Sequence, residues 1–257
     1  MPEGLEAEIW RRAANVLVGR RIDTVWFDDR VAPADLAEAV ERCAIVAVRR
    51  LGKVVLIDTD GPSLGLHFGM TGRLEVDGRA PIAELEYASG ADRAEWDRLR
   101  LYTVGSRTVP ALRMNDPRRL GRLSLDPDLS HLGPDVLSLD ARDLANRIGH
   151  RRAAIKPILL DQGVVAGLGN LCADEVLFWA GIAPLRRASD LSSSDVERLV
   201  EACRERLPKM LVAGGSTAGE LSPAVRSALP PCPLDGGRLE RATLGGRTAV
   251  WCAQHQH

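Results

Sequence analysis

The sequence has few lysines, few aromatic residues and no long apolar run. Only three of its 34 basic residues are lysines, and aromatic residues make up 4% of the 257-residue chain. No apolar stretch reaches the roughly 20 residues that a membrane-spanning helix needs. The start, Met1-Pro2-Glu3-Gly4, has neither the basic region nor the apolar core of a signal peptide. These absences predict a cytoplasmic protein without membrane partners.

The chain also lacks a disulfide framework and a strong net charge. Its cysteines are odd in number and widely scattered: Cys43, Cys172, Cys203, Cys232 and Cys252. The formal net charge is −1, so any affinity for nucleic acid depends on local basic clusters. Because arginine is always charged, a rare lysine suits a role that needs a titratable amine, although codon usage is an equally good explanation.

The pattern along the chain predicts an α+β protein of two domains. Residues 3–18 have the apolar spacing of an amphipathic helix. Short apolar or alternating runs then predict a β-sandwich, at 21–27, 44–48, 54–58, 63–68, 99–104 and 111–114. Residues 124–138 have the composition of a linker. The second half is helical at 140–148, 157–161, 170–179 and 194–212, and ends in a hairpin at 238–249.

The first residues could carry chemistry. Removal of Met1 would leave Pro2 with a free secondary amine, and an α-amino group titrates near ~8. Attack of this amine on a sugar carbon would give an iminium ion, and Glu3 could transfer the proton. A chain that begins Met-Pro by chance is the alternative.

The tail has the spacing of a structural zinc site. Cys232 and Asp235 form one pair, and after sixteen residues Cys252 and His255 form the second. Aspartate is an unusual ligand at this place, and His257 is a further possibility. A hairpin without metal is the alternative.

Two kinds of feature suggest phosphate binding. Gly163, Gly167 and Gly169 precede a helix, where backbone N–H groups can hold a phosphate and Asn170 can add a donor. Arginines and one lysine form two clusters, which could follow a phosphate backbone or simply be solvated: Arg113, Arg118, Arg119 and Arg122, then Arg151, Arg152 and Lys156.

Together the motifs resemble the formamidopyrimidine-DNA glycosylase/endonuclease VIII family. They run in order from Pro2 to His255: MPEG at 1–4, GK at 52–53, HFGMTG at 67–72, NDPRR at 115–119, GPDVL at 133–137, IKPILLDQ at 155–162, VAGLGN at 165–170, GGST at 214–217 and GRT at 246–248. The resemblance implies a catalytic β-sandwich domain (1–137), a helix–two-turn–helix domain (138–228) and a zinc-finger-like hairpin (229–257), with DNA between the first two.

The resemblance also implies a bifunctional DNA glycosylase and AP lyase of base excision repair. Pro2 would attack C1′ of a flipped nucleotide, Glu3 would protonate the sugar, and Lys53 would contact phosphate and assist proton transfer. DNA contacts would come from Met70, Arg118, Leu120, Lys156, Asn170 and Arg247. The iminium would allow β,δ-elimination. Zinc would be held by Cys232, Asp235, Cys252 and His255. The expected partner is double-stranded DNA with damaged bases or abasic sites, bound by a monomer in the bacterial nucleoid.

Three departures affect specificity. Position 120 is leucine, where purine-type members have an aromatic wedge. Asp235 and His255 stand in the finger, where four cysteines are commonest. Residues 218–230 are too few for the longer capping loop that family members often have. The start resembles the pyrimidine-type branch and residues 155–162 the purine-type branch. We favour 8-oxoguanine and formamidopyrimidine lesions over oxidised pyrimidines. A catalytically silent paralogue that binds damaged DNA, or a regulatory protein that acts through its finger, remains the alternative.

Overall fold

The chain folds into two compact units. The computed structural model describes residues 2–83, 85–86, 91–106 and 108–257, so Met1 lies outside the described residues. One unit comprises Pro2 and Glu6–Leu129, and the other comprises Glu3–Leu5 and Ser130–His257. The units therefore divide inside the expected linker, ahead of the expected limit at residue 137. Within the described residues, no helix is both long and apolar enough to cross a membrane.

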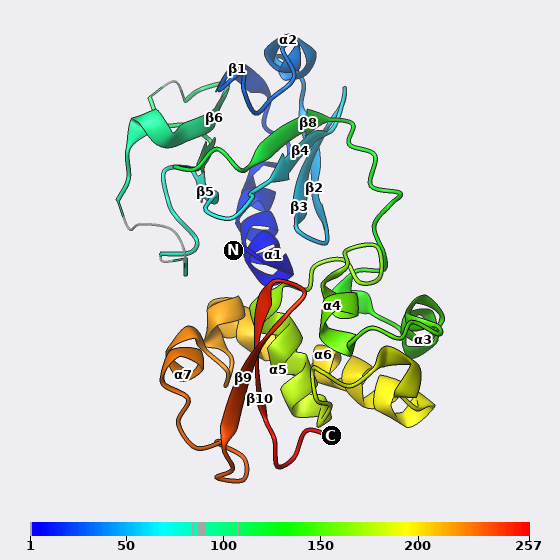
Figure 1. Cartoon of the computed structure of the whole chain (residues 1–257). Helices are drawn as coiled ribbons and strands as arrows, with labels where there is room; N and C mark the ends of the chain where they lie inside the picture. Colours follow the sequence, from blue (N-terminus) through cyan, green and yellow to red (C-terminus); the bar gives the residue numbers. More distant parts are fainter. Residues whose placement is uncertain (1, 84, 87–90, 107) are drawn as a thin grey trace. The chain divides into compact units, whose positions relative to one another are not determined.

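The first unit is a sandwich of two antiparallel sheets (Figure 1). One sheet has the order β1 (Ile22–Phe27), β6 (Asp97–Thr103), β7 (Leu112–Asn115) and β5 (Arg73–Val76). The other has the order β2 (Ile45–Leu51), β3 (Val54–Thr59), β4 (Leu64–His67) and β8 (Arg122–Leu125). The expected sandwich is confirmed, but no run was expected at β5, and the end of β8 fell within the expected linker at 124–138.

Helix α1 (Gly4–Ala14) belongs to the same core as the two sheets. It continues into the 3-10 turn Asn15–Leu17. Trp10 is fully buried, and its ring centroid lies 4.1 Å from that of Phe68, just after β4. The apolar stripe expected at residues 3–18 therefore faces the sandwich. A short helix, α2 (Leu36–Val40), joins the core and was not expected from the sequence.

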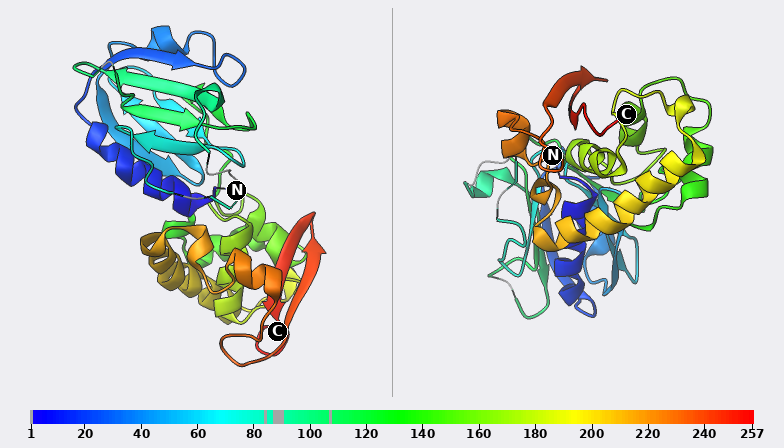
Figure 2. Two further views of the ribbon diagram at one scale, coloured as in Figure 1. Left: turned by 90° about the vertical axis from the view of Figure 1, so that its left-hand side faces the viewer. Right: turned by 90° about the horizontal axis from the view of Figure 1, so that it is seen from below.

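The second unit is helical and ends in a β-hairpin, as predicted. Its longer helices are α3 (Ala141–Ile148), α4 (Ile155–Leu160), α5 (Asn170–Ala180), α6 (Ser193–Ala213) and α7 (Pro223–Ala228). The hairpin consists of β9 (Leu239–Leu244) and β10 (Arg247–Cys252). Its apolar residues share a core with Phe178 of α5, and both views of Figure 2 show the hairpin along the helices.

Capping chemistry explains the longest helix. Ser192 accepts the N–H of Asp195 at 3.2 Å, while Asp195 accepts the N–H of Ser192 at 2.8 Å, which is a complete capping box. Gly214, with φ of 120°, ends the helix. The structure thus confirms the helix expected at 194–212. Helix α7 was missed because its six residues show too little periodicity.

Candidate active site

The carboxylate of Glu3 binds the N-terminus of α5. Its Oε2 accepts the N–H groups of Gly169 (2.9 Å) and Cys172 (3.1 Å), and its Oε1 accepts that of Leu171 (2.8 Å). Glu3 is 2% exposed. An anion at a helix N-terminus satisfies N–H groups that have no partner within the helix. The carboxylate that the sequence proposes as proton donor is thus held in one orientation.

Glycines make this arrangement possible. A Cβ on Gly169 would lie 2.3 Å from Cδ of Glu3, so no side chain fits there while the carboxylate is in place. The N–H of Gly4 donates to the carbonyl of Gly167 at 2.8 Å, and Gly167 has φ of 105°, a region that favours glycine. The expectation that this glycine loop offers its N–H groups to a phosphate needs correction. The N–H of Gly169 donates to Glu3, and those of Gly163 and Gly167 donate to the side chains of Asp161 and Gln162.

Asn170 is the first residue of α5 and is half-buried. Among the described residues, its Oδ1 atom is buried without a hydrogen-bond partner. Such an atom is costly unless a ligand or water satisfies it. Because the two ends of an amide are assigned rather than observed, the same position can present the NH₂ donor that a phosphate requires.

Arg247 directly follows the turn of the terminal hairpin, whose strands β9 and β10 are labelled in Figure 1. Gly245 and Gly246 form the turn with φ of 55° and 74°, the geometry that a two-residue hairpin turn requires. Arg247 follows as the first residue of β10 and is exposed. Its guanidinium is therefore presented to solvent directly beside a short turn.

In the first unit, Lys53 lies in the turn between β2 and β3, directly after Gly52. His67, the last residue of β4, pairs with Val54 of β3 on one side and with Arg122 of β8 on the other. Partial burial, Lys53 and Arg122 lower the pKa of His67. Lys53 and Arg122 thus supply the positive charge that suits a phosphate, and the neutral imidazole of His67 lies between them as a hydrogen-bonding group. The sequence reasoning missed His67, because only strand register brings it beside Lys53.

Met70, Arg118 and Leu120 lie on two loops that Asp116 joins. Asp116 is fully buried and accepts the hydroxyl of Thr71 at 2.5 Å. It also accepts the N–H groups of Leu120 (2.7 Å), Gly121 (2.7 Å) and Arg118 (3.2 Å). The Leu120 side chain is 42% exposed, as an inserted wedge must be.

Several residues of the two basic clusters form ion pairs within the protein. Arg113 donates to Glu75, Asp92 and Asp97, and its pKa is raised chiefly by the bond to Asp92. Arg119 pairs with Asp28 at 2.8 Å and Arg151 with Asp161 at 3.3 Å. Part of each cluster is therefore engaged in ion pairs within the protein.

The largest correction concerns Lys156. Its side chain has no exposed surface, and its ammonium lies 2.7 Å from Asp174 and donates to the Thr248 carbonyl at 2.6 Å. A group so enclosed cannot contact DNA directly. Nothing in the local sequence indicated this burial, because the partners lie 18 and 92 residues away along the chain.

Cys232, Asp235, Cys252 and His255 do come together. One donor atom from each lies within 4.8 Å of the others. Four ligands at ~2.0–2.3 Å from a tetrahedral zinc ion would be ~3.3–3.8 Å apart, so small shifts would complete the site. His255 Nδ1 faces the group, while Nε2 lies 3.3 Å from the Phe178 carbonyl, the kind of contact that orients a metal-bound imidazole. His257 is outside this group.

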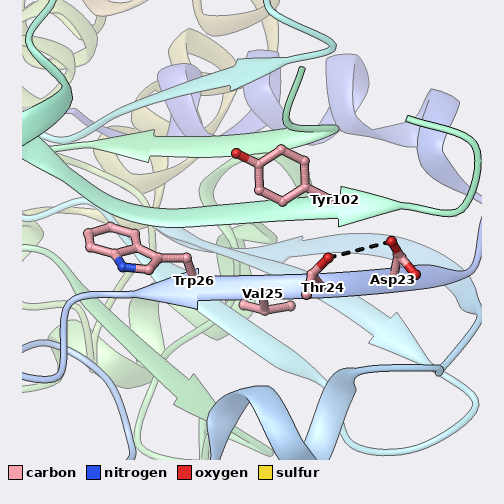
Figure 3. A pocket seen from close by; sticks show the side chains of 5 residues that line it. All are labelled: Asp23, Thr24, Val25, Trp26 and Tyr102. Atoms are coloured by element: carbon pink, nitrogen blue, oxygen red, sulfur yellow. Dashed lines mark hydrogen bonds between the residues drawn. The ribbon is translucent and has the colours of Figure 1, made fainter. Parts of the chain in front are cut away.

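An open hollow of about 580 Å³ lies elsewhere in the first unit (Figure 3). Its lining residues come from β1 and β6: Asp23, Thr24, Val25, Trp26 and Tyr102. Arg100 stacks on Trp26 with its guanidinium carbon 4.8 Å from the ring centroid. None of the residues proposed for catalysis or DNA contact lines this hollow.

A β-sandwich with an N-terminal Pro-Glu and a helical unit with a Cys/His hairpin define a two-domain DNA glycosylase, and the comparisons agree. Residues 1–123 match the family model of the formamidopyrimidine-DNA glycosylase N-terminal domain, and residues 132–221 match that of its H2TH domain. The chain belongs to the formamidopyrimidine-DNA glycosylase family.

Curated relatives and solved structures extend over the whole chain. The formamidopyrimidine-DNA glycosylase of Xanthomonas campestris pv. campestris (strain B100) is 37% identical, with 100% of each chain covered. That of Stenotrophomonas maltophilia (strain R551-3) is 35% identical, covering 98% of this chain and 95% of the relative. The MutM (Fpg) structure from Thermus thermophilus has a TM-score of 0.80 at 29% identity, covering 99% of this chain and 98% of that one.

A fourth comparison includes DNA. A Lactococcus lactis Fpg variant in complex with Fapy-dG-containing DNA has a TM-score of 0.83 at 25% identity, with 100% of each chain covered. The chain is therefore a DNA glycosylase of base excision repair.

Proposed function

We propose that this protein excises oxidised purines of the 8-oxoguanine and formamidopyrimidine type, and then nicks the strand as an AP lyase. The observation that carries the proposal is the fixed Glu3 carboxylate directly after Pro2. The names of the relatives and the Fapy-dG and carbocyclic 8-oxo-G complexes among the structural neighbours favour purine lesions over oxidised pyrimidines.

In the proposed reaction, the free amine of Pro2 attacks C1′ of the flipped nucleotide. Glu3 protonates the opening sugar, and departure of the base leaves an iminium ion between Pro2 and C1′. The iminium withdraws electrons and acidifies the C2′ hydrogen, so β-elimination and then δ-elimination break the strand. Lys53 assists as a phosphate contact and proton carrier.

DNA binding would use residues of both units. Asn170 and Arg247 would hold phosphates from the second unit, and Lys53 with His67 from the first. Met70, Arg118 and Leu120 would fill the space left by the flipped base, with leucine a weaker stacking group than an aromatic wedge. We expect a monomer to bind damaged or abasic duplex DNA, and this role places the protein at the bacterial nucleoid.

We further propose that Cys232, Asp235, Cys252 and His255 hold a structural zinc ion. The ion would crosslink the end of β10 to the segment before β9. It would supply no reacting group, because all four positions around it are filled by protein ligands.

The test is borohydride trapping on an abasic duplex. Protein with Met1 removed should form a covalent adduct, whereas Pro2→Gly, or protein that retains Met1, should not. A Lys209→Met variant is a matched control, since Lys209 is an exposed lysine of α6. Failure of homogeneous, processed protein to form any adduct would favour the silent damaged-DNA-binding paralogue. A panel of duplexes with single defined lesions then decides the preferred base.

A further inference from the structure

The second unit contains a buried ionic cluster with parts from four elements. Lys156 of α4 lies 2.7 Å from Asp174 of α5. Arg226 of α7 pairs with the other oxygen of Asp174. Lys156 and Arg226 also donate to one backbone atom, the carbonyl of Thr248 in β10, at 2.6 and 2.8 Å. Asp174 in turn accepts the N–H of Val250 at 3.0 Å.

The cluster is sealed from solvent. The side chains of Lys156 and Asp174 are 0% exposed and that of Arg226 is 8% exposed. Charges in such a place must be matched, because an unpaired buried ion costs several kcal/mol. Two cations face the carboxylate of Asp174, and the charge of Glu3 adds a weaker attraction on Lys156. Burial lowers the pKa of Lys156, while Asp174 and Glu3 oppose that shift.

The bonds fall on the strand that begins with Arg247. Thr248 is its neighbour, and Val250 lies two residues further on. Thr248 pairs with Thr243 and Arg247 pairs with Leu244, so the position of Thr248 constrains that of Arg247 beside the turn. The metal-ligand group lies at the opposite end of the strand, at Cys252. Besides its apolar packing with Phe178, the strand is held at two polar places within the described residues, and the ionic cluster is the one nearer to Arg247.

We propose that Lys156, Asp174 and Arg226 are positioning residues that hold β10 so that Arg247 meets a DNA phosphate. The inference rests on the proposed phosphate contact of Arg247. It replaces direct DNA contact as the role of Lys156. It also links the two ends of the site: α5 binds Glu3 at its N-terminus and, one turn later, binds the strand of Arg247 through Asp174.

The experiment compares Lys156→Met with Arg247→Ala and the control Lys209→Met in the full chain. Three quantities are measured: amide exchange of Val250, affinity for an abasic duplex over a salt series, and the excision rate at saturating enzyme. Lys156→Met should speed exchange at Val250 at least tenfold and weaken DNA binding at least tenfold. Its salt slope should fall by about one, as in Arg247→Ala, since one phosphate contact is lost. The saturated rate should stay within about threefold of the wild type, which a general loss of structure would not allow.

A double variant tests the ionic coupling. Lys156→Met with Asp174→Asn removes one charge of each sign, so its loss of affinity should be smaller than the sum of the two single losses. If a single variant fails to fold, recovery of folding in the double variant supports the proposal. A double variant that stays unfolded overturns it. The proposal is also overturned if Lys156→Met and Lys209→Met show the same amide exchange at Val250 and the same affinity for DNA. Unchanged binding in Arg247→Ala refutes the phosphate contact itself, while Val250 exchange still reports on the anchor.

Discussion

Glu3 and Gly169 are 166 residues apart in the chain, yet the N–H of Gly169 donates to the Glu3 carboxylate at 2.9 Å. The helix start that could have bound a phosphate instead holds the acidic residue beside Pro2. The position of this carboxylate therefore depends on the absence of a side chain at residue 169.

Gly169→Ala should disable excision with little loss of fold. The new Cβ would lie 2.3 Å from Glu3 Cδ, so the carboxylate must leave the helix N-terminus. We expect the single-turnover excision rate to fall at least tenfold, which corresponds to about 1.4 kcal/mol in the barrier. Gly163→Ala, on the same loop, is the control, since its Cβ would come no closer than 3.2 Å to a neighbour. Equal rates for the two variants would contradict this prediction.

Asp116→Ala should destabilise the first unit and loosen the Leu120 loop. The change leaves the N–H groups of Leu120 and Gly121 without their acceptor in a buried place. Each lost partner costs roughly 1–3 kcal/mol. We expect a lower melting temperature, and weaker quenching of a fluorescent base placed opposite the lesion. Thr71→Val removes only one of the four bonds and should have a smaller effect on both measurements.

Glu8 should make stability depend on acid pH. Burial raises its pKa, but bonds from Arg11, Arg12 and Arg50 outweigh this and lower it from 4.5 to about 2. A lowered folded-state pKa gives stability that is present above pH ~4.5 and is lost as the pH falls toward ~2. Glu8→Gln should therefore cost on the order of 2 kcal/mol at pH 7 and flatten the acid limb, as followed by denaturant unfolding at several pH values. Parallel curves for wild type and variant between pH 5 and 2 would refute the assignment.

Metal content should follow the donor set of the hairpin. As-isolated protein is expected to contain about one zinc per chain, and Cys252→Ala should lose it. Asp235→Cys should tighten zinc binding at least tenfold, because thiolate is the softer ligand. Competition with a chromophoric chelator measures both. A wild-type chain with negligible zinc and an intact hairpin would show that the group stands without metal.

Local patterns in the sequence determined most of the architecture. Turn residues and apolar alternation marked β1 and β3, capping residues marked α6, and the paired Gly245-Gly246 marked the terminal hairpin. Each of these elements is long enough, or capped clearly enough, for its own residues to specify it. The strands β5 and β8 were recognised only in the structure, where each pairs with a neighbouring strand.

The motifs of the sequence also identified the residues of the proposed chemistry: Pro2, Glu3, the metal-ligand group and Arg247. The environment of several functional residues became known from the folded structure alone. It showed that Glu3 occupies the N-terminus of α5, that His67 joins Lys53, and that Lys156 is buried against Asp174. The reason is physical: a charged residue has the same local sequence signal whether it faces solvent or a buried partner, and that partner is brought near only when the chain folds.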